Sequence, residues 1–134
     1  MYELRIYYED TDAGGVVYYA NYLKYFERAR TEHFRELGLD IMDMINRGVY
    51  FIVARTEIDF QVSAQLGDIL QIETRIIELT KVSVTVDYIV KRKSDKKIVV
   101  KGKSKLACIN DNNRIMRIPQ DIYDKLNSNL QHIK

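Results

Sequence analysis

The apolar residues of this chain follow two different spacings, which separate one long helix from a series of strands. Residues 22–37 carry apolar side chains at helical intervals. The members of this apolar face are Leu23, Phe26, Phe34 and Leu37. Residues 82–90 alternate between apolar and polar side chains instead, as a strand with one covered face does. One main helix followed by several strands predicts an α+β domain whose antiparallel sheet packs against that helix.

Capping and turn residues set the expected limits of these elements. Asn21 is expected to cap the N-terminus of the main helix, and Gly38 suits the position after its end. Asp40 and Gly48 bound a shorter helix in the same way. The remaining elements are expected to be strands at 2–8, 49–61, 69–79 and 98–108 and a short C-terminal helix from Pro119 to about Leu126.

Length, composition and charge describe a single globular domain, residues 1–134. The chain has 46% hydrophobic residues and one proline, which is ordinary for a domain with one core. Its 21 basic and 19 acidic residues give a net charge of +2, too small to attract nucleic acid or anionic lipid. No apolar run has the length of a signal peptide core or a membrane span. We therefore expect a soluble, cytoplasmic protein with no nucleic-acid partner and no membrane insertion.

One cysteine and two histidines leave little material for metal or triad chemistry. No Cys/His cluster has the spacing of a zinc site, so no metal is expected. Cys108 shares its strand parity with apolar residues and is expected to be buried rather than nucleophilic. His33 is expected to be packed and hydrogen-bonded, and His132 falls in a polar tail. A catalytic triad is therefore disfavoured.

An acidic loop with two glycines, residues 9–20, directly precedes the main helix. Asp12 is our candidate for a reactive carboxylate, because it stands before Ala13-Gly14-Gly15, where the backbone can approach a ligand closely. The alternative is a turn residue whose side chain bonds its own backbone. Glu9 and Asp10 are competing carboxylates, and the sequence ranks the three only weakly.

The start of the main helix is the second part of this candidate site. Tyr18 and Tyr19 stand just before it, so their main-chain N–H groups are expected to be free to bind an oxygen atom. Their side chains are equally consistent with packing in a core or a subunit contact. A carboxylate next to such donors indicates acyl-transfer chemistry, in which the donors hold a carbonyl oxygen as it gains charge.

Two further charged groups are open to structural interpretation. Arg30 lies on the apolar face of the main helix, and the i,i+3 spacing to Glu27 predicts a partly buried ion pair with an anchoring role. Lysines 101, 103 and 105 project from one face of strand 98–108. We expect a solvated outer face there, with recognition of the phosphates of a nucleotide-bearing substrate as the alternative.

The residues around the acidic loop also resemble a known family. The segment from Arg5 to Phe34 is similar to the 4-hydroxybenzoyl-CoA thioesterase family, and within it to the bacterial Tol-Pal-associated members. The motifs that carry the resemblance are Tyr8-Glu9-Asp10-Thr11-Asp12-Ala13-Gly14-Gly15-Val16-Val17-Tyr18, Phe26-Glu27-Arg28-Ala29-Arg30 and Phe60-Gln61-x-x-Ala64-x-x-Gly67-Asp68. The resemblance implies a hotdog fold, in which the sheet wraps a long helix, and a homodimer that often pairs into a homotetramer.

The resemblance also assigns roles to residues. Asp12 would be the catalytic carboxylate, as nucleophile or general base, and the Tyr19 N–H would polarise the thioester carbonyl. Tyr19 replaces the histidine usual in the Tol-Pal-associated members, so an acid/base role for a histidine side chain is lost while the backbone role remains. Residues expected to contact the substrate are Gly15, Val16, Tyr18 and Asn21, with Lys81 and Ser83 toward the CoA phosphates. No cofactor is implied, because CoA is part of the substrate.

Three hypotheses follow for the function. The main one is a homo-oligomeric thioesterase that hydrolyses acyl-CoA to a free acid and CoA. The second is a non-catalytic acyl-CoA or acyl-carrier binding module, which the replacement at Tyr19 keeps open. A dehydratase on the same fold is disfavoured, because His33 is the one histidine near the main helix. Nucleic-acid binding through the lysine strand is disfavoured too, because the lysines lack interleaved aromatic residues.

Overall fold

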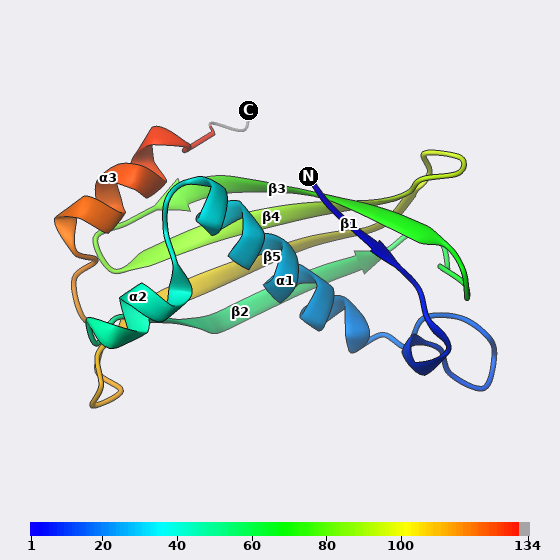
Figure 1. Ribbon diagram of the computed structural model, residues 1–134, viewed down its shortest axis with the longest axis horizontal. Helices are drawn as coiled ribbons and strands as arrows, with labels where there is room; N and C mark the ends of the chain where they lie inside the picture. The colour runs from blue at the N-terminus through cyan, green and yellow to red at the C-terminus, as the bar shows by residue number, and fades with distance from the viewer. Residues whose placement is uncertain (132–134) are drawn as a thin grey trace.

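A computed structural model describes residues 1–131, which form an antiparallel sheet folded around helix α1 (Asn21–Glu36), as Figure 1 shows. The sheet has five strands in the order β1-β3-β4-β5-β2. The strands are β1 (Tyr2–Arg5), β2 (Tyr50–Phe60), β3 (Ile69–Leu79), β4 (Ser83–Arg92) and β5 (Ile98–Ile109). Two short helices, α2 (Ile41–Asn46) and α3 (Gln120–Ser128), lie at one end of the sheet (Figure 1). The predicted α+β architecture is confirmed.

Helix α1 lies directly on the concave face of the sheet. The Phe26 ring stacks on Tyr88 of β4, with centroids 4.2 Å apart and planes 4° from parallel. Gly102 of β5 pairs with Tyr88, and a side chain there would collide with the Phe26 ring. Gly102 therefore permits the close approach of helix and sheet that centres the core.

The buried face of α1 contains Phe26 and Phe34 as predicted but not Leu23. The helix residues in the core are Tyr22, Tyr25, Phe26, Ala29 and Phe34. Leu23 is 46% exposed, so its predicted burial is wrong. The helical stripe that faces the sheet passes through 22, 25, 26 and 29, and Leu23 lies outside this stripe.

Two predicted boundaries also change. The first strand ends at Arg5 rather than residue 8, because a single 3-10 turn, η1 (Tyr8–Asp10), starts the acidic loop. Asn21 is the first residue of α1 and not its cap, a position taken by Ala20 without a side-chain bond. Asp40 caps α2 as predicted, since its Oδ1 accepts from the Met42 N–H at 2.8 Å.

Strand β2 forms a free edge of the sheet. Within residues 1–131 it pairs with β5 alone. Ile52 and Val53 on this strand are each 46% exposed. An edge strand of this length with exposed apolar side chains is a surface that proteins normally cover.

None of the helices among the described residues has the length and apolar character needed to cross a bilayer. His132 lies outside the described residues.

Candidate active site

The acidic loop folds back on itself around Asp12. The Asp12 N–H donates to the Val16 carbonyl at 2.9 Å, and the Gly15 N–H donates to the Asp12 carbonyl at 3.0 Å. Gly15 has a φ of +78°, which favours glycine. Asp12 Oδ1 accepts from the Gly14 N–H at 2.8 Å, so the turn interpretation of this side chain is correct. Its Oδ2 has no hydrogen-bond partner in residues 1–131, and the residue is exposed, so one carboxylate oxygen stays available.

Asp10 differs from Asp12 in its partners, because both its carboxylate and its main-chain carbonyl accept hydrogen bonds from neighbouring segments. Its Oδ2 accepts from the Tyr7 N–H at 2.7 Å. Its carbonyl accepts from the Tyr18 N–H at 3.0 Å and from the Asn21 side chain at 2.8 Å. Asp10 therefore ties the loop to the start of α1. Of these two acids Asp12 is exposed and Asp10 is half-buried.

Tyr25 supports the loop from below. Its hydroxyl is buried and has no hydrogen-bond partner among residues 1–131. Burial, and next the nearby Asp10 carboxylate, raise the pKa of Tyr25, so its hydroxyl stays protonated at neutral pH. The Tyr25 hydroxyl thus lies near Asp10 of the acidic loop.

The start of α1 leaves N–H donors free. The prediction for Tyr18 is wrong, because its N–H is bound to the Asp10 carbonyl. The prediction for Tyr19 is correct, because neither its N–H nor that of Ala20 has an acceptor within residues 1–131. The positive end of the α1 dipole lies at the same place. This corner of the molecule can bind a partly negative oxygen atom.

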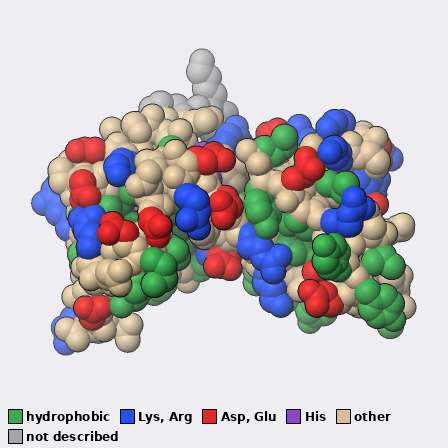
Figure 2. Space-filling model, viewed as in Figure 1, with side chains coloured by type: hydrophobic (Ala, Val, Ile, Leu, Met, Phe, Trp, Pro, Cys, Tyr) green, Lys and Arg blue, Asp and Glu red, His purple; other side chains and the backbone are tan. Residues whose placement is uncertain are grey.

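An apolar cavity of about 200 Å³ adjoins this helix start. The Phe60 ring at the end of β2 packs on Tyr19 at 5.1 Å and on Tyr22 at 5.9 Å, measured between ring centroids. Val17 bonds through its N–H to the Ala64 carbonyl at 2.9 Å, which holds the loop against the segment after β2. Figure 2 shows hydrophobic side chains exposed at this end of the molecule. The carboxylate, the free donors and an apolar surface thus meet in one region.

Lys81 and Ser83 lie elsewhere in the subunit. Lys81 lies in the β3–β4 turn and Ser83 begins β4, at the far end of the sheet from the acidic loop (Figure 1). Lys81 is exposed, and the Ser83 side chain is buried against Thr80, with 2.7 Å between the two hydroxyl oxygens. A single subunit therefore does not bring these two residues to the Asp12 loop, whereas Gly15, Val16 and Tyr18 belong to that loop and Asn21 follows it as the first residue of α1.

The other predicted side-chain roles divide as follows. The Glu27–Arg30 ion pair is wrong for residues 1–131: Arg30 donates to the Tyr88 hydroxyl at 3.4 Å, and Glu27 points to solvent. His33 is packed and hydrogen-bonded, with its Nε2 3.1 Å from Asn129 Oδ1. Cys108 is buried, and burial raises the pKa of its thiol to about 11. The side chains of lysines 101, 103 and 105 face solvent, as expected.

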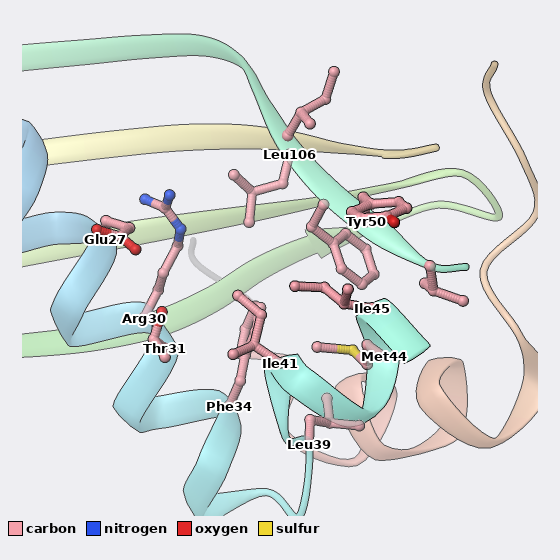
Figure 3. Close-up of a pocket in the computed structure, with 13 residues that line it drawn as sticks. Glu27, Arg30, Thr31, Phe34, Leu39, Ile41, Met44, Ile45, Tyr50 and Leu106 are labelled. Atoms are coloured by element: carbon pink, nitrogen blue, oxygen red, sulfur yellow. The ribbon is translucent and has the colours of Figure 1, made fainter. Parts of the chain in front are cut away.

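The sequence analysis did not predict the cavity that lies between α1, α2 and β2. Met44, Ile45 and Phe34 line it, together with the start of β2 (Figure 3). The residues of α2 follow no strong pattern over so short a helix. The cavity depends on how that helix packs on the sheet edge, which periodicity does not report.

A carboxylate in a glycine-containing loop, next to free N–H groups at the start of a sheet-wrapped helix, is an arrangement suited to chemistry at a carbonyl group. The sequence model of a family described as the thioesterase-like superfamily matches residues 7–126. The chain belongs to this superfamily, which confirms the family resemblance seen in its motifs.

Similar proteins agree with this assignment. The acyl-CoA thioesterase YbgC of Haemophilus influenzae is 38% identical over 109 residues, which cover 81% of this chain and 79% of that protein. A hypothetical protein from Thermus thermophilus superposes with a TM-score of 0.90 at 30% identity, over 96% of this chain and 97% of its own. A gentisyl-coenzyme A thioesterase superposes with a TM-score of 0.86 at 25% identity, over 93% and 98%. The predicted hotdog fold is thereby confirmed.

Proposed function

We propose that this protein is an acyl-CoA thioesterase, which hydrolyses an acyl-CoA to a free acid and CoA. The observation that carries the proposal is the placement of the Asp12 carboxylate on the same short segment as the free Tyr19 N–H. Membership of the thioesterase-like superfamily and similarity to a protein named acyl-CoA thioesterase support it. Hydrolysis of a thioester needs a base or nucleophile and a means to stabilise the oxyanion, and in this proposal Asp12 supplies the first and the Tyr19 N–H the second.

The Tyr19 N–H binds the thioester carbonyl oxygen in the proposed mechanism. Asp12 then either attacks the carbonyl carbon, giving an anhydride that water opens, or takes a proton from the water that attacks. In both routes the bond from carbon to sulfur breaks and CoA leaves as the thiolate, which becomes the thiol by taking up a proton that the attacking water releases. The turn that orients Asp12 uses Oδ1, so Oδ2 is the oxygen free to react. The side chain of Tyr19 takes no part, and its replacement of histidine leaves the mechanism intact.

The protein is proposed to act as a homodimer joined through β2. The free edge and the exposed Ile52 and Val53 support antiparallel pairing of two copies of this strand. A twofold axis through the middle of β2 reverses the partner's sheet. The β3–β4 turn of the partner subunit then comes to the same end as the Asp12 loop of this one. In this assembly Lys81 of the partner subunit can meet the phosphates of CoA.

Thiol release from a panel of acyl-CoAs tests the reaction, with Asp12→Asn as the variant. Asparagine keeps the acceptor for the Gly14 N–H, so the turn is preserved. We expect kcat to fall at least about 100-fold, because the general base or nucleophile is lost. Glu9→Gln is the matched control, since Glu9 is exposed in the same loop and has no side-chain partner in residues 1–131; its turnover is expected to match the wild type.

Near-normal turnover by Asp12→Asn would remove Asp12 from the reaction. Wild-type protein that binds acyl-CoA tightly but releases no thiol from any ester would instead favour the non-catalytic binding module. The size of the protein in solution, measured by light scattering, tests the dimer separately.

A further inference from the structure

The Tyr25 hydroxyl is the one buried side-chain polar atom that lacks a hydrogen-bond partner among residues 1–131. Only 1% of the Tyr25 surface is exposed, and its ring packs edge-on against Tyr22, with centroids 5.7 Å apart. A buried hydroxyl without a partner is unfavourable, because it has lost its hydrogen bonds to water and gained none in the protein. Such groups are uncommon in folded proteins, and a role in function is one reason for their retention.

The position of Tyr25 on α1 directs this hydroxyl toward Asp10. Tyr25 lies one helical turn after Asn21 and on the same face, and the Asn21 side chain donates to the Asp10 carbonyl at 2.8 Å. Long side chains of a helix lean toward its N-terminus, so the Tyr25 ring leans toward the turn that contacts Asp10. Burial, and next the Asp10 carboxylate, raise the pKa of Tyr25, which agrees with this placement.

The Asp10 carboxylate has an oxygen that can accept from this hydroxyl. Its Oδ2 accepts from the Tyr7 N–H at 2.7 Å, whereas Oδ1 accepts no hydrogen bond from the part of the chain that the structure describes. The side chain is half-buried, so water reaches it only in part. A donor without an acceptor and an acceptor without a donor therefore lie next to each other.

We propose that Tyr25 is a positioning residue of the candidate active site, and that its hydroxyl donates to Asp10 Oδ1 when substrate is bound. The proposal rests on the proposed thioesterase function and adds a residue to its site. Hydrogen bonds that serve catalysis are often open in the free enzyme and close in the complex with substrate. Bound substrate excludes water from this corner, which makes two unpaired polar groups more costly and the bond between them stronger.

The bond acts on the reaction through the main chain of Asp10. The Asp10 carbonyl accepts from the Tyr18 N–H at 3.0 Å, which leaves the Tyr19 N–H as the free donor beside it. A second contact to the Asp10 side chain fixes this arrangement, together with the path of the loop to Asp12 two residues further on. Precise placement matters here, because a displacement of about 1 Å in a reactive site lowers the rate by up to about 100-fold.

Removal of the hydroxyl tests the proposal, since Tyr25→Phe keeps the ring and its packing. We expect kcat to fall about tenfold with KM unchanged, because the loop is held less precisely in the transition state. The denaturant midpoint of the free protein is expected to stay the same or rise, since the free protein loses no hydrogen bond and an unpaired buried hydroxyl is removed. A lower midpoint with a normal kcat would show a purely structural tyrosine and overturn the proposal.

Tyr123→Phe is the matched control. Tyr123 is a half-buried tyrosine of α3, at the other end of the sheet from the acidic loop (Figure 1). Its loss of a hydroxyl is expected to leave kcat at the wild-type value.

A double-mutant cycle identifies Asp10 as the partner. Asp10→Ala removes the carboxylate and keeps the main-chain carbonyl. Tyr25→Phe added to Asp10→Ala is expected to lower kcat by less than about twofold, because the acceptor of the hydroxyl is already absent. A further tenfold fall would show that Tyr25 acts independently of Asp10 and would overturn the proposal.

Hydrogen exchange at the Tyr18 amide tests the contact without turnover. The probe is an acyl-CoA analogue in which methylene replaces the thioester sulfur, added at saturation. We expect it to slow the exchange at least about tenfold in the wild type and less than about twofold in Tyr25→Phe, because the bond to Asp10 holds the acceptor of this amide. Equal effects on both proteins, including no effect on either, would overturn the proposal and leave the thioesterase function standing. Absence of thiol release from every ester by the wild type would contradict the thioesterase function instead.

Discussion

Main-chain groups are hydrogen-bonded at the C-terminal end of α1, whereas some at its N-terminal end have no partner. At the C-terminal end, Leu39 donates its N–H to the Phe34 carbonyl at 2.9 Å, and Lys125 of α3 donates to the Gly38 carbonyl at 3.1 Å. At the N-terminal end, the Tyr19 N–H has no acceptor in residues 1–131. Two small helices cover the first of these ends, and a loop lies beside the second (Figure 1).

This contrast separates stability from chemistry. Satisfied carbonyls and a packed α2 stabilise the C-terminal end. The N–H donors at the N-terminal end have no protein acceptor, and water can solvate them in the free protein. They can stabilise a carbonyl oxygen when that oxygen replaces the water. Substitutions at the two ends should therefore affect different measurements.

The largest expected effect is a difference in the free energy of unfolding between alanine substitutions of two aromatic residues, one near each end of α1. Phe34 is 6% exposed, so Phe34→Ala should lower the free energy of unfolding by about 3–5 kcal/mol, because it leaves a cavity. Tyr19 is 69% exposed, so Tyr19→Ala should change it by less than about 1 kcal/mol. Denaturant unfolding measures both. Equal losses would show that the N-terminal corner is part of the core and would break the contrast.

The next largest effect is expected on kcat, from residues whose side chains form hydrogen bonds at the N-termini of α1 and α2. Asn21→Ala removes the bond to the Asp10 carbonyl and loosens the loop, so we expect kcat to fall about tenfold, with a loss of about 1 kcal/mol in the free energy of unfolding. Asp40→Ala removes the cap of α2, with a similar loss of stability. Its kcat for butyryl-CoA is expected to stay near the wild-type value. A normal kcat in Asn21→Ala would mean that the bond does not position Asp12.

The smallest effect is a dependence of stability on pH at the closed end. Asp121 of α3 accepts two hydrogen bonds from Arg47, at 2.8 and 2.9 Å, and this contact lowers the pKa of Asp121 to about 2. A pKa lowered by folding stabilises the fold above the ordinary value and loses that contribution as the pH falls from about 4 to about 2. Asp121→Asn should flatten this part of the acid unfolding curve. Asp124→Asn, on the same helix, is the control that keeps it.

Periodicity and turn chemistry predicted most of the fold. The alternation over residues 82–90 correctly predicts a strand with Val84, Val86, Tyr88 and Val90 buried, but Val82 is 38% exposed and precedes β4, and Ser83 and Thr85 on the other face are buried too. Gly38 has the positive φ expected after the end of α1. Asn21 was predicted as a cap because its residue type suits one. Its side chain bonds the Asp10 carbonyl instead, and that partner lies in a loop whose path no periodicity encodes.

The sequence was enough to predict which segment forms the candidate site, but not which of its N–H groups are free. The sequence places Asp12 and Tyr19 on one loop, yet whether the Tyr18 or the Tyr19 N–H is free depends on how η1 turns the Asp10 carbonyl. The Glu27–Arg30 prediction failed for a similar reason. Helical spacing permits that pair, but the sheet offers Arg30 the Tyr88 hydroxyl on its buried side.

The Tyr19 amide is the most direct test of the proposed oxyanion site. NMR chemical shifts of the backbone amides would be compared with and without an acyl-CoA analogue whose thioester sulfur is replaced by methylene, which cannot be hydrolysed. We predict a downfield shift of the Tyr19 N–H proton as it binds the ketone oxygen, with little change for Tyr18, whose N–H is already bound to Asp10. Saturating analogue that leaves the Tyr19 amide unshifted would contradict an oxyanion site at the start of α1.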